Sequence, residues 1–113
     1  MRKPRRGELW LVNLGEPSGH EQGWKRPALV VSSDHWNEHA GTLTVLPLTR
    51  NNRGLPSRVE LEPGDRNGLK ETSYARCEDI RSISENRLET RLGVVSLEDM
   101  KAVERTLRTF LEL

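Results

Sequence analysis

A chain of 113 residues can form one domain with a modest core and is too short for a two-domain enzyme that closes around a cleft. Hydrophobic residues make up 34% and charged residues 31%, so we expect a single domain over residues 1–113 that buries further apolar surface as a homodimer. The net charge divides into +4 over residues 1–59 (9 Lys and Arg, 5 Asp and Glu) and −3 over residues 60–113 (9 and 12). This asymmetry suits an anionic ligand such as single-stranded RNA and is too weak for a high-affinity duplex binder.

Two apolar segments in the first half predict buried strands. Residues 8–14 are short, almost wholly apolar and bounded by glycines, which favours a strand over a helix. Because proline cannot donate a hydrogen bond to a ladder, Arg26 and Pro27 should form the entry of a second strand, with residues 28–31 as its buried body. Arg26 is therefore expected at the mouth of a strand.

The remaining strands are shorter and their limits are less distinct. Residues 42–49 begin with alternating polar and apolar side chains, and Pro47 predicts an edge or a bulge that frees Thr49 from the ladder. Further strands are expected over residues 57–61, 69–76, 78–83 and 92–95, with a turn over residues 86–90.

The one clear helix signal begins after Ser96. Ser96 is a suitable N-cap, acidic residues follow in the first turn, and apolar residues recur at three- and four-residue spacing. We expect the whole stripe to be core: Leu97, Met100, Val103, Leu107, Phe110 and Leu111. Many short strands and one terminal helix indicate an α+β domain.

Several classes of protein are disfavoured by what the sequence lacks. No apolar run approaches the roughly 20 residues of a membrane span, and basic residues 1–6 precede Gly7 rather than an apolar signal core, so we expect a cytoplasmic protein. The single Cys77 cannot form an internal disulfide and is expected in a strand or the core. No Cys or His cluster has ligand spacing, so we expect neither a metal site nor a cofactor.

Chemically active side chains gather in a glycine-punctuated loop that breaks into the second strand. Gly15, Gly19 and Gly23 recur every fourth residue and allow left-handed turns and close approach of the backbone to a ligand. An acid, bases and hydrogen-bond donors lie among them: His20, Glu21, Gln22, Lys25 and Arg26. The alternative to a binding site is a solvated hairpin connection, since loops are commonly polar.

Three segments carry a family resemblance. Residues 6–14, residues 19–31 and residues 44–49 are similar to the first three strands and the first loop of the MazF/PemK family of bacterial toxin-antitoxin ribonucleases. The specific part is the spacing Gly-x-Glu-Gln-x-x-x-Arg-Pro, from Gly19 to Pro27. The resemblance implies a small, strongly twisted antiparallel SH3-like barrel with a C-terminal helix, of the type shared with the gyrase poison CcdB.

The resemblance also implies an activity and partners. It implies cleavage of single-stranded mRNA by the RNA's own 2′-hydroxyl, leaving a 2′,3′-cyclic phosphate and a 5′-hydroxyl, with a cognate antitoxin as inhibitor. It implies that Arg26 and Thr49 are the catalytic pair. An arginine suits this task because its permanently charged, planar fork of donors matches phosphate oxygens.

The remaining candidates come from the loop. Glu21 is the candidate general base, and His20, where many relatives have Ser, is its rival or a binding group. For substrate binding we assign His20, Gln22, Trp24 and Lys25. Trp24 could instead pin the loop to the barrel, and Gln22 could read a base edge.

One alternative function belongs to a different class. A non-enzymatic module on the same barrel, such as a CcdB-like toxin that blocks a protein target, would need no catalytic pair. Arg26 and Thr49 beside the glycine loop argue against it, although an inactive homologue would retain both residues.

Overall fold

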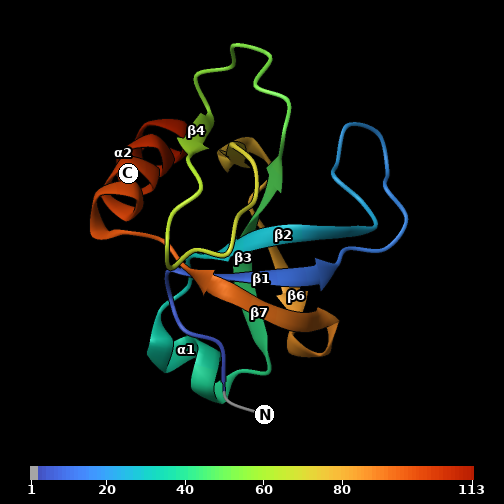
Figure 1. Ribbon diagram of the computed structural model, residues 1–113. Helices are drawn as coiled ribbons and strands as arrows, with labels where there is room; N and C mark the ends of the chain where they lie inside the picture. Colours follow the sequence, from blue (N-terminus) through green and yellow to red (C-terminus); the bar gives the residue numbers. More distant parts are fainter. Residues whose placement is uncertain (1–2) are drawn as a thin grey trace.

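The structure, a computed structural model, describes residues 3–113, which form one antiparallel seven-stranded sheet with a long C-terminal helix (Figure 1). The strand order is β4-β5-β3-β2-β1-β7, and β6 pairs with β3 beside this path. The elements are β1 (Glu8–Asn13), β2 (Lys25–Val30), α1 (Asp34–His39), β3 (Thr42–Thr49), β4 (Arg58–Leu61), β5 (Ser73–Arg76), η1 (Cys77–Asp79), β6 (Arg81–Ser84), η2 (Glu85–Arg87), β7 (Leu88–Val94) and α2 (Leu97–Leu111). The expected α+β class, antiparallel sheet and C-terminal helix are confirmed.

Strand β3 changes partners at Pro47. Up to this residue it pairs with β2 and β6, and beyond it pairs with β5, where Thr49 lies opposite Tyr74. A residue without an N–H is tolerated at such a change because no ladder bond is lost there. The prediction that Thr49 leaves the ladder is therefore wrong, since Pro47 changes the partner of the strand rather than ending it.

The sheet is covered on both faces by apolar side chains. Successive residues of a strand point to opposite faces, so Leu29 of β2 joins one buried cluster while Ala28 and Val30 join the other. The first cluster also contains Met100 and Val103 of α2, which packs on that face. Burial on both faces explains why β1 and β2 read as nearly continuous apolar runs.

Helix α2 is capped as the sequence predicts. The Ser96 side chain accepts a hydrogen bond from the backbone amide three residues later (3.1 Å). Met100 and Val103 are buried, but the prediction that the whole stripe is core is wrong at its ends, where Leu97, Phe110 and Leu111 are exposed. Within residues 3–113, neither α2 nor any other helix is long and apolar enough to cross a membrane.

Several element boundaries differ from those predicted. Strand β5 begins at Ser73 rather than at residue 69, the strand expected over residues 78–83 is η1 followed by β6, and β7 begins at Leu88 rather than at residue 92. Strand β2 begins at Lys25, so Arg26 and Pro27 lie within it and pair with β1. The turn expected over residues 86–90 is shorter, because η2 ends at Arg87 and β7 begins at once.

Candidate active site

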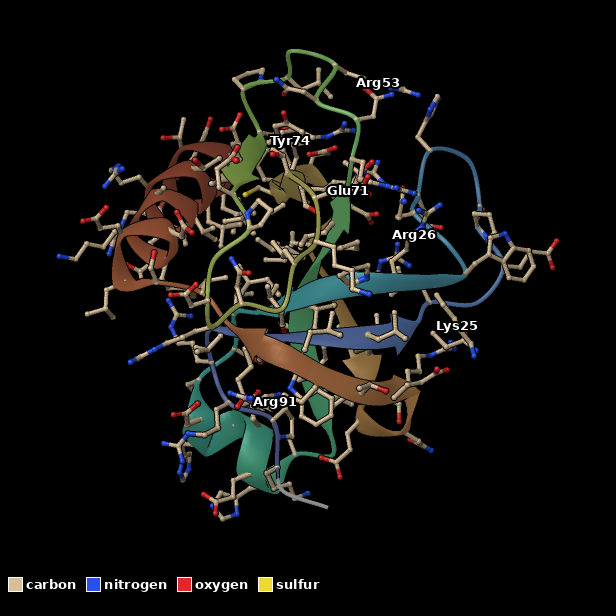
Figure 2. The ribbon with its side chains drawn as sticks, in the orientation of Figure 1. Lys25, Arg26, Arg53, Glu71, Tyr74 and Arg91 are labelled. Carbon is tan, nitrogen blue, oxygen red and sulfur yellow. The ribbon has the colours of Figure 1, made fainter. Side chains whose placement is uncertain are left out.

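A cavity of about 970 Å³ opens at the end of the sheet where β2 begins and β3 ends. Its walls are two loops, the β1–β2 loop (residues 14–24) and the β3–β4 loop (residues 50–57). In Figure 2, Arg53 lies on the upper, green loop and Arg26 on the cyan strand β2 below it. Tyr74 of β5 contributes to the wall between them.

The cavity brings Arg26 and Thr49 together. The last pair between β2 and β3 is Ala28 with Pro47, and Arg26 and Thr49 each lie two residues beyond it on their own strands, at the same end of the sheet. Both side chains line the cavity, so the structure brings the two residues of the expected catalytic pair to one place.

Arg26 carries unused hydrogen-bonding capacity. Within residues 3–113, no ion pair joins its guanidinium to a carboxylate, and its buried Nε has no hydrogen-bond partner. Such groups are rare, since an unsatisfied buried donor costs roughly 1–3 kcal/mol. An anionic ligand in the cavity would supply the missing acceptor.

Thr49 is oriented by the start of the β3–β4 loop. Its Oγ1 accepts a hydrogen bond from the backbone amide of Asn51 (3.2 Å). A hydroxyl that accepts one bond can still donate its own proton. Thr49 is therefore able to donate to an oxygen atom held beside Arg26.

The residues that line the cavity carry a net positive charge. Two carboxylates, Glu21 and Glu78, face five arginines: Arg26, Arg50, Arg53, Arg58 and Arg76. A concave surface with an excess of one charge concentrates ligands of the opposite charge. A polyanion fits this surface better than a neutral ligand does.

The β1–β2 loop has a narrow neck and a polar tip. Two backbone hydrogen bonds close the neck. The Leu14 amide donates to the carbonyl of Trp24 (2.8 Å), and the Trp24 amide donates to the carbonyl of Gly15 (2.6 Å). Gly15 and Gly19 have the expected left-handed conformation, whereas Gly23 is required for another reason: a Cβ there would lie 2.5 Å from Pro17. This shape brings the tip, with exposed His20 and Glu21, to the cavity.

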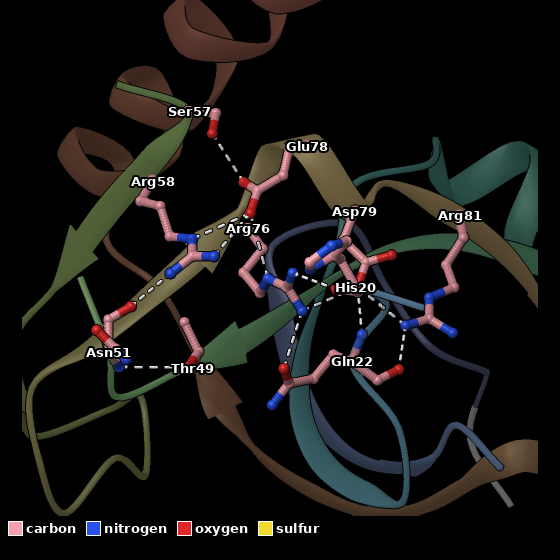
Figure 3. A network of polar contacts seen from close by, with 10 residues as sticks. All are labelled: His20, Gln22, Thr49, Asn51, Ser57, Arg58, Arg76, Glu78, Asp79 and Arg81. Carbon is pink, nitrogen blue, oxygen red and sulfur yellow. Dashed lines mark hydrogen bonds and ion pairs between the residues drawn. The ribbon is translucent and has the colours of Figure 1, made fainter. Parts of the chain in front are cut away.

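Hydrogen bonds join the tip to the segment from β5 to β6 through Gln22 and through His20, two residues before it (Figure 3). The Gln22 amide donates to Asp79 Oδ2 (2.9 Å), and its carbonyl accepts from Arg81. Arg76 donates to Gln22 Oε1 (2.8 Å) and to the carbonyl of His20 (2.9 Å). Gln22 thus anchors the loop, and its side-chain oxygen is engaged within the protein.

The opposite wall is held by Arg58 and Glu78. Arg58 donates to Glu78 Oε2 (3.0 Å) and to the carbonyl of Asn51 (2.6 Å). Burial acts to raise the pKa of the Glu78 carboxyl. Hydrogen bonds from Ser57, from its own backbone amide and from Arg58 act to lower this pKa, and so does the positive charge of Arg58. Together these lowering effects are larger than the effect of burial. The pKa of Glu78 therefore lies below its ordinary value.

Two predicted binding residues lie outside the main cavity. Lys25 forms an ion pair with Glu89 (3.2 Å) and lines a second cavity of about 370 Å³, which shares Arg26 and Thr49 with the first. Trp24 has a left-handed backbone (φ 60°) and a side chain that is 60% exposed, so it does not pin the loop to the barrel.

The residues that hold the two walls in place were not among the predicted site residues. Arg58, Arg76, Glu78, Asp79 and Arg81 stand in expected strands and carried no assigned role. The signals for four of them were a density of opposite charges around Cys77 and a weaker family resemblance over residues 78–83. The residue Cys77 itself is buried in η1, and burial together with the charge of Glu78 raises the pKa of its thiol to about 11.

No group of three or more His, Cys, Asp and Glu side chains within residues 3–113 lies close enough together to hold a metal ion. The charged groups at the cavity are instead mostly guanidinium groups.

Fold and site together define a small antiparallel domain with an arginine and a threonine at the floor of a cationic cavity. The family described as PemK-like, MazF-like toxin of type II toxin-antitoxin system matches residues 5–111, nearly the whole chain. The chain belongs to this family.

Individual relatives agree with this assignment. "Endoribonuclease MazF9" of Mycobacterium tuberculosis is 36% identical and the match covers 96% of this chain and 97% of that protein. The crystal structure of MazF from Deinococcus radiodurans superposes with a TM-score of 0.87 at 28% identity, covering all of both chains. A mycobacterial endoribonuclease in complex with its cognate antitoxin gives 0.82 at 28% identity, over 97% of this chain and 96% of that one.

Proposed function

We propose that this toxin is an endoribonuclease that cleaves single-stranded mRNA by attack of the RNA's 2′-hydroxyl on the adjacent phosphate, without a metal ion. The endoribonuclease class follows from the family and from the relative named an endoribonuclease at 36% identity. The chemistry is inferred from the site. The observation that carries it is the Arg26 guanidinium, which has no ion pair within residues 3–113 and lines the same cationic cavity as Thr49.

Arg26 and Thr49 are assigned to the phosphate. As the 2′-oxygen attacks, negative charge grows on the non-bridging oxygens, and donors already in place stabilise it without reorganisation. Arg26 offers charge and a fork of N–H groups, and Thr49 offers one O–H. A permanent positive charge at this point supplies the electrostatic stabilisation that a metal ion would otherwise provide.

Proton transfer is assigned to the tip of the β1–β2 loop. The reaction needs a base for the 2′-hydroxyl proton and an acid for the leaving 5′-oxygen. Glu21 and His20 line the same cavity as Arg26 and are the candidates for these two tasks. We assign the base to Glu21 and keep His20 as its rival.

Two cavities that meet at the catalytic pair suit a strand of RNA. The larger cavity and the smaller one share Arg26 and Thr49, so a phosphate bound there would have a nucleotide on either side. Lys25 lies in the smaller cavity and can contact a flanking phosphate. Exposed Trp24 can stack on an unpaired base beyond it.

We further propose an antitoxin partner, a homodimer and a cytoplasmic location. A solved relative is described as being in complex with its cognate antitoxin. An acidic segment of such a partner would compete with RNA for Arg26 and Lys25. The exposed apolar residues Phe110 and Leu111 are consistent with a further contact surface, and mRNA as substrate requires the cytoplasm.

The test is incubation of the purified protein with a long RNA in excess EDTA, followed by separation of the fragments. Cleavage of single-stranded regions is expected to persist under chelation and to fail in an Arg26→Ala control of unchanged melting temperature. Activity that appears only on addition of a divalent metal would contradict the mechanism. Absence of cleavage, with tight binding to a protein target, would favour the non-enzymatic alternative.

A further inference from the structure

We propose that three residues around η1, Arg76, Asp79 and Arg81, act as a positioning device for the cleavage reaction. This loop clamp fixes residues 20–22 at the tip of the β1–β2 loop. It thereby sets where the proton-transfer group of the loop stands relative to Arg26. The inference rests on the proposed function, which supplies the reaction, and extends it to three residues of which two, Asp79 and Arg81, are not among those that line the main cavity.

The clamp acts mainly on the backbone of the loop. Asp79 accepts from the amide of Gln22, Arg81 donates to the carbonyl of Gln22, and Arg76 donates to the carbonyl of His20 (Figure 3). Bonds to both the N–H and the C=O of one residue restrict its backbone as a strand ladder does. The clamp therefore fixes the path of the tip and not merely one side chain.

The clamp is itself a rigid, largely buried unit. Asp79 Oδ2 accepts from Arg76 Nη1 (3.2 Å) and Arg81 Nη2 (3.0 Å). The Asp79 and Arg76 side chains are 9% and 8% exposed. Charge-assisted bonds shielded from water are stronger than the exposed ion pairs of a protein surface. Their positions follow from η1, which separates β5 from β6 along the chain while both strands pair with β3, and so brings Arg76, Asp79 and Arg81 close together.

The loop needs such support. Its own backbone hydrogen bonds are those that close the neck near Gly15 and one turn in which the Glu21 amide donates to the carbonyl of Ser18 (3.1 Å). The glycine-rich composition of the loop allows many other conformations. A displacement of about 1 Å in a reacting group can cost on the order of 100-fold in rate. Loss of the clamp should therefore lower turnover more than it lowers substrate affinity.

Asp79 provides the sharpest test because it is not among the residues that line the main cavity, whereas Arg76 is. We would compare Asp79→Asn, which removes the charge, with Arg76→Lys, which keeps a charge but cannot span four acceptors. The matched control is Arg91→Lys, which weakens the ion pair with buried Glu8 (2.8 Å) far from Arg26 (Figure 2).

The measurements are kcat and KM for RNA cleavage, melting temperature, and hydrogen exchange of the Gln22 amide. For Asp79→Asn and Arg76→Lys we expect kcat to fall by roughly 100-fold, KM to change by less than about threefold, and the amide to exchange faster. Arg91→Lys should lower the melting temperature by about as much as the two clamp variants do, but it should leave kcat unchanged. If Asp79→Asn does not fold, Arg81→Met replaces it, since Arg81 is more exposed.

Three results would overturn the inference. Unchanged exchange of the Gln22 amide in the folded variants would mean that the clamp does not hold the loop. Faster exchange with normal kcat would mean that loop position is irrelevant to cleavage. A kcat loss equal to that of Arg91→Lys would indicate a purely structural role. If the wild-type protein cleaves no RNA, the proposed function fails, and the exchange measurement alone decides whether the clamp holds the loop.

Discussion

The two loops that form the walls of the cavity are held in different ways. The β1–β2 loop is fixed at its tip, where backbone groups of Gln22 bond to the sheet. The β3–β4 loop is fixed at its base, where Asn51 bonds to Arg58 and Thr49, while its tip forms a turn with Arg53 in a left-handed conformation (φ 55°). The first wall is thus held at its tip and the second at its base, so we expect the tip of the second to adapt more readily to a ligand. We therefore expect the first to govern turnover and the second to govern binding.

The largest effect is expected at the floor, where both walls meet. Arg26→Ala should reduce kcat by at least about 100-fold, because it removes the principal donor to the phosphate. Thr49→Val, which keeps the shape and the strand propensity but removes the hydroxyl, should also reduce kcat strongly. Single-turnover cleavage rates and melting curves check both. Normal turnover in either variant would place the reaction elsewhere.

The base of the β3–β4 loop gives the next largest effect. Arg58→Gln removes the bonds to Glu78 and to the carbonyl of Asn51. We expect KM to rise by about 10-fold with kcat falling less, the reverse of the pattern expected for the loop clamp. Steady-state kinetics on one RNA substrate separate the two patterns. Equal effects on kcat for both loops would remove the distinction between the walls.

The tip of the β3–β4 loop should have a smaller effect. Arg53 is exposed, lines the cavity and lies in no ion pair within residues 3–113. Arg53→Ala should raise the RNA dissociation constant a few-fold and reduce the slope of log K against log salt by about 0.7, the value for one phosphate contact on a single strand. Lys101→Ala on α2 is the control and should leave the slope unchanged.

The smallest effect concerns stability and pH. Because the pKa of Glu78 is lowered on folding from its ordinary 4.5, the residue stabilises the protein above that pH, and this contribution is lost as pH falls through the lowered value. Glu78→Gln should be less stable at neutral pH, and the difference should shrink in acid. Urea unfolding at several pH values measures it. A difference that grows on acidification would contradict the assigned ion pair.

The sequence predicted the strands best where both faces are buried. Strands β1 and β2 consist of apolar runs with clear ends, so their limits differ from the predicted ones by few residues. Trp36 shows a limit of sequence-based prediction: the large apolar area of an aromatic side chain favours a core position for it over an exposed one, but in α1 it is 51% exposed. Likewise, the spacing of apolar residues in α2 was predicted correctly, but the packing of the helix against the sheet decides which of these residues are buried.

The site was predictable only where one segment carried it. Arg26, Glu21 and Gln22 belong to a single motif, and Thr49 ends the strand that pairs with β2 up to Pro47. The clamp residues lie more than 50 positions from the loop they hold, and their contacts depend on how η1 breaks the strand. Local patterns carry no signal for such a contact. For the same reason the sequence assigned Gln22 to the substrate, although its side-chain oxygen bonds to Arg76.

The most direct test of the account is the chemistry of the cut. An RNA with a mapped cleavage site is cleaved in excess EDTA, and the new ends are identified by mass spectrometry. A second RNA carries a 2′-O-methyl group at the nucleotide preceding the cut. We expect a 2′,3′-cyclic phosphate and a 5′-hydroxyl from the first RNA and no cleavage at the blocked position of the second. A 5′-phosphate end, or undiminished cleavage of the blocked RNA, would contradict attack by the 2′-hydroxyl in the Arg26 and Thr49 cavity.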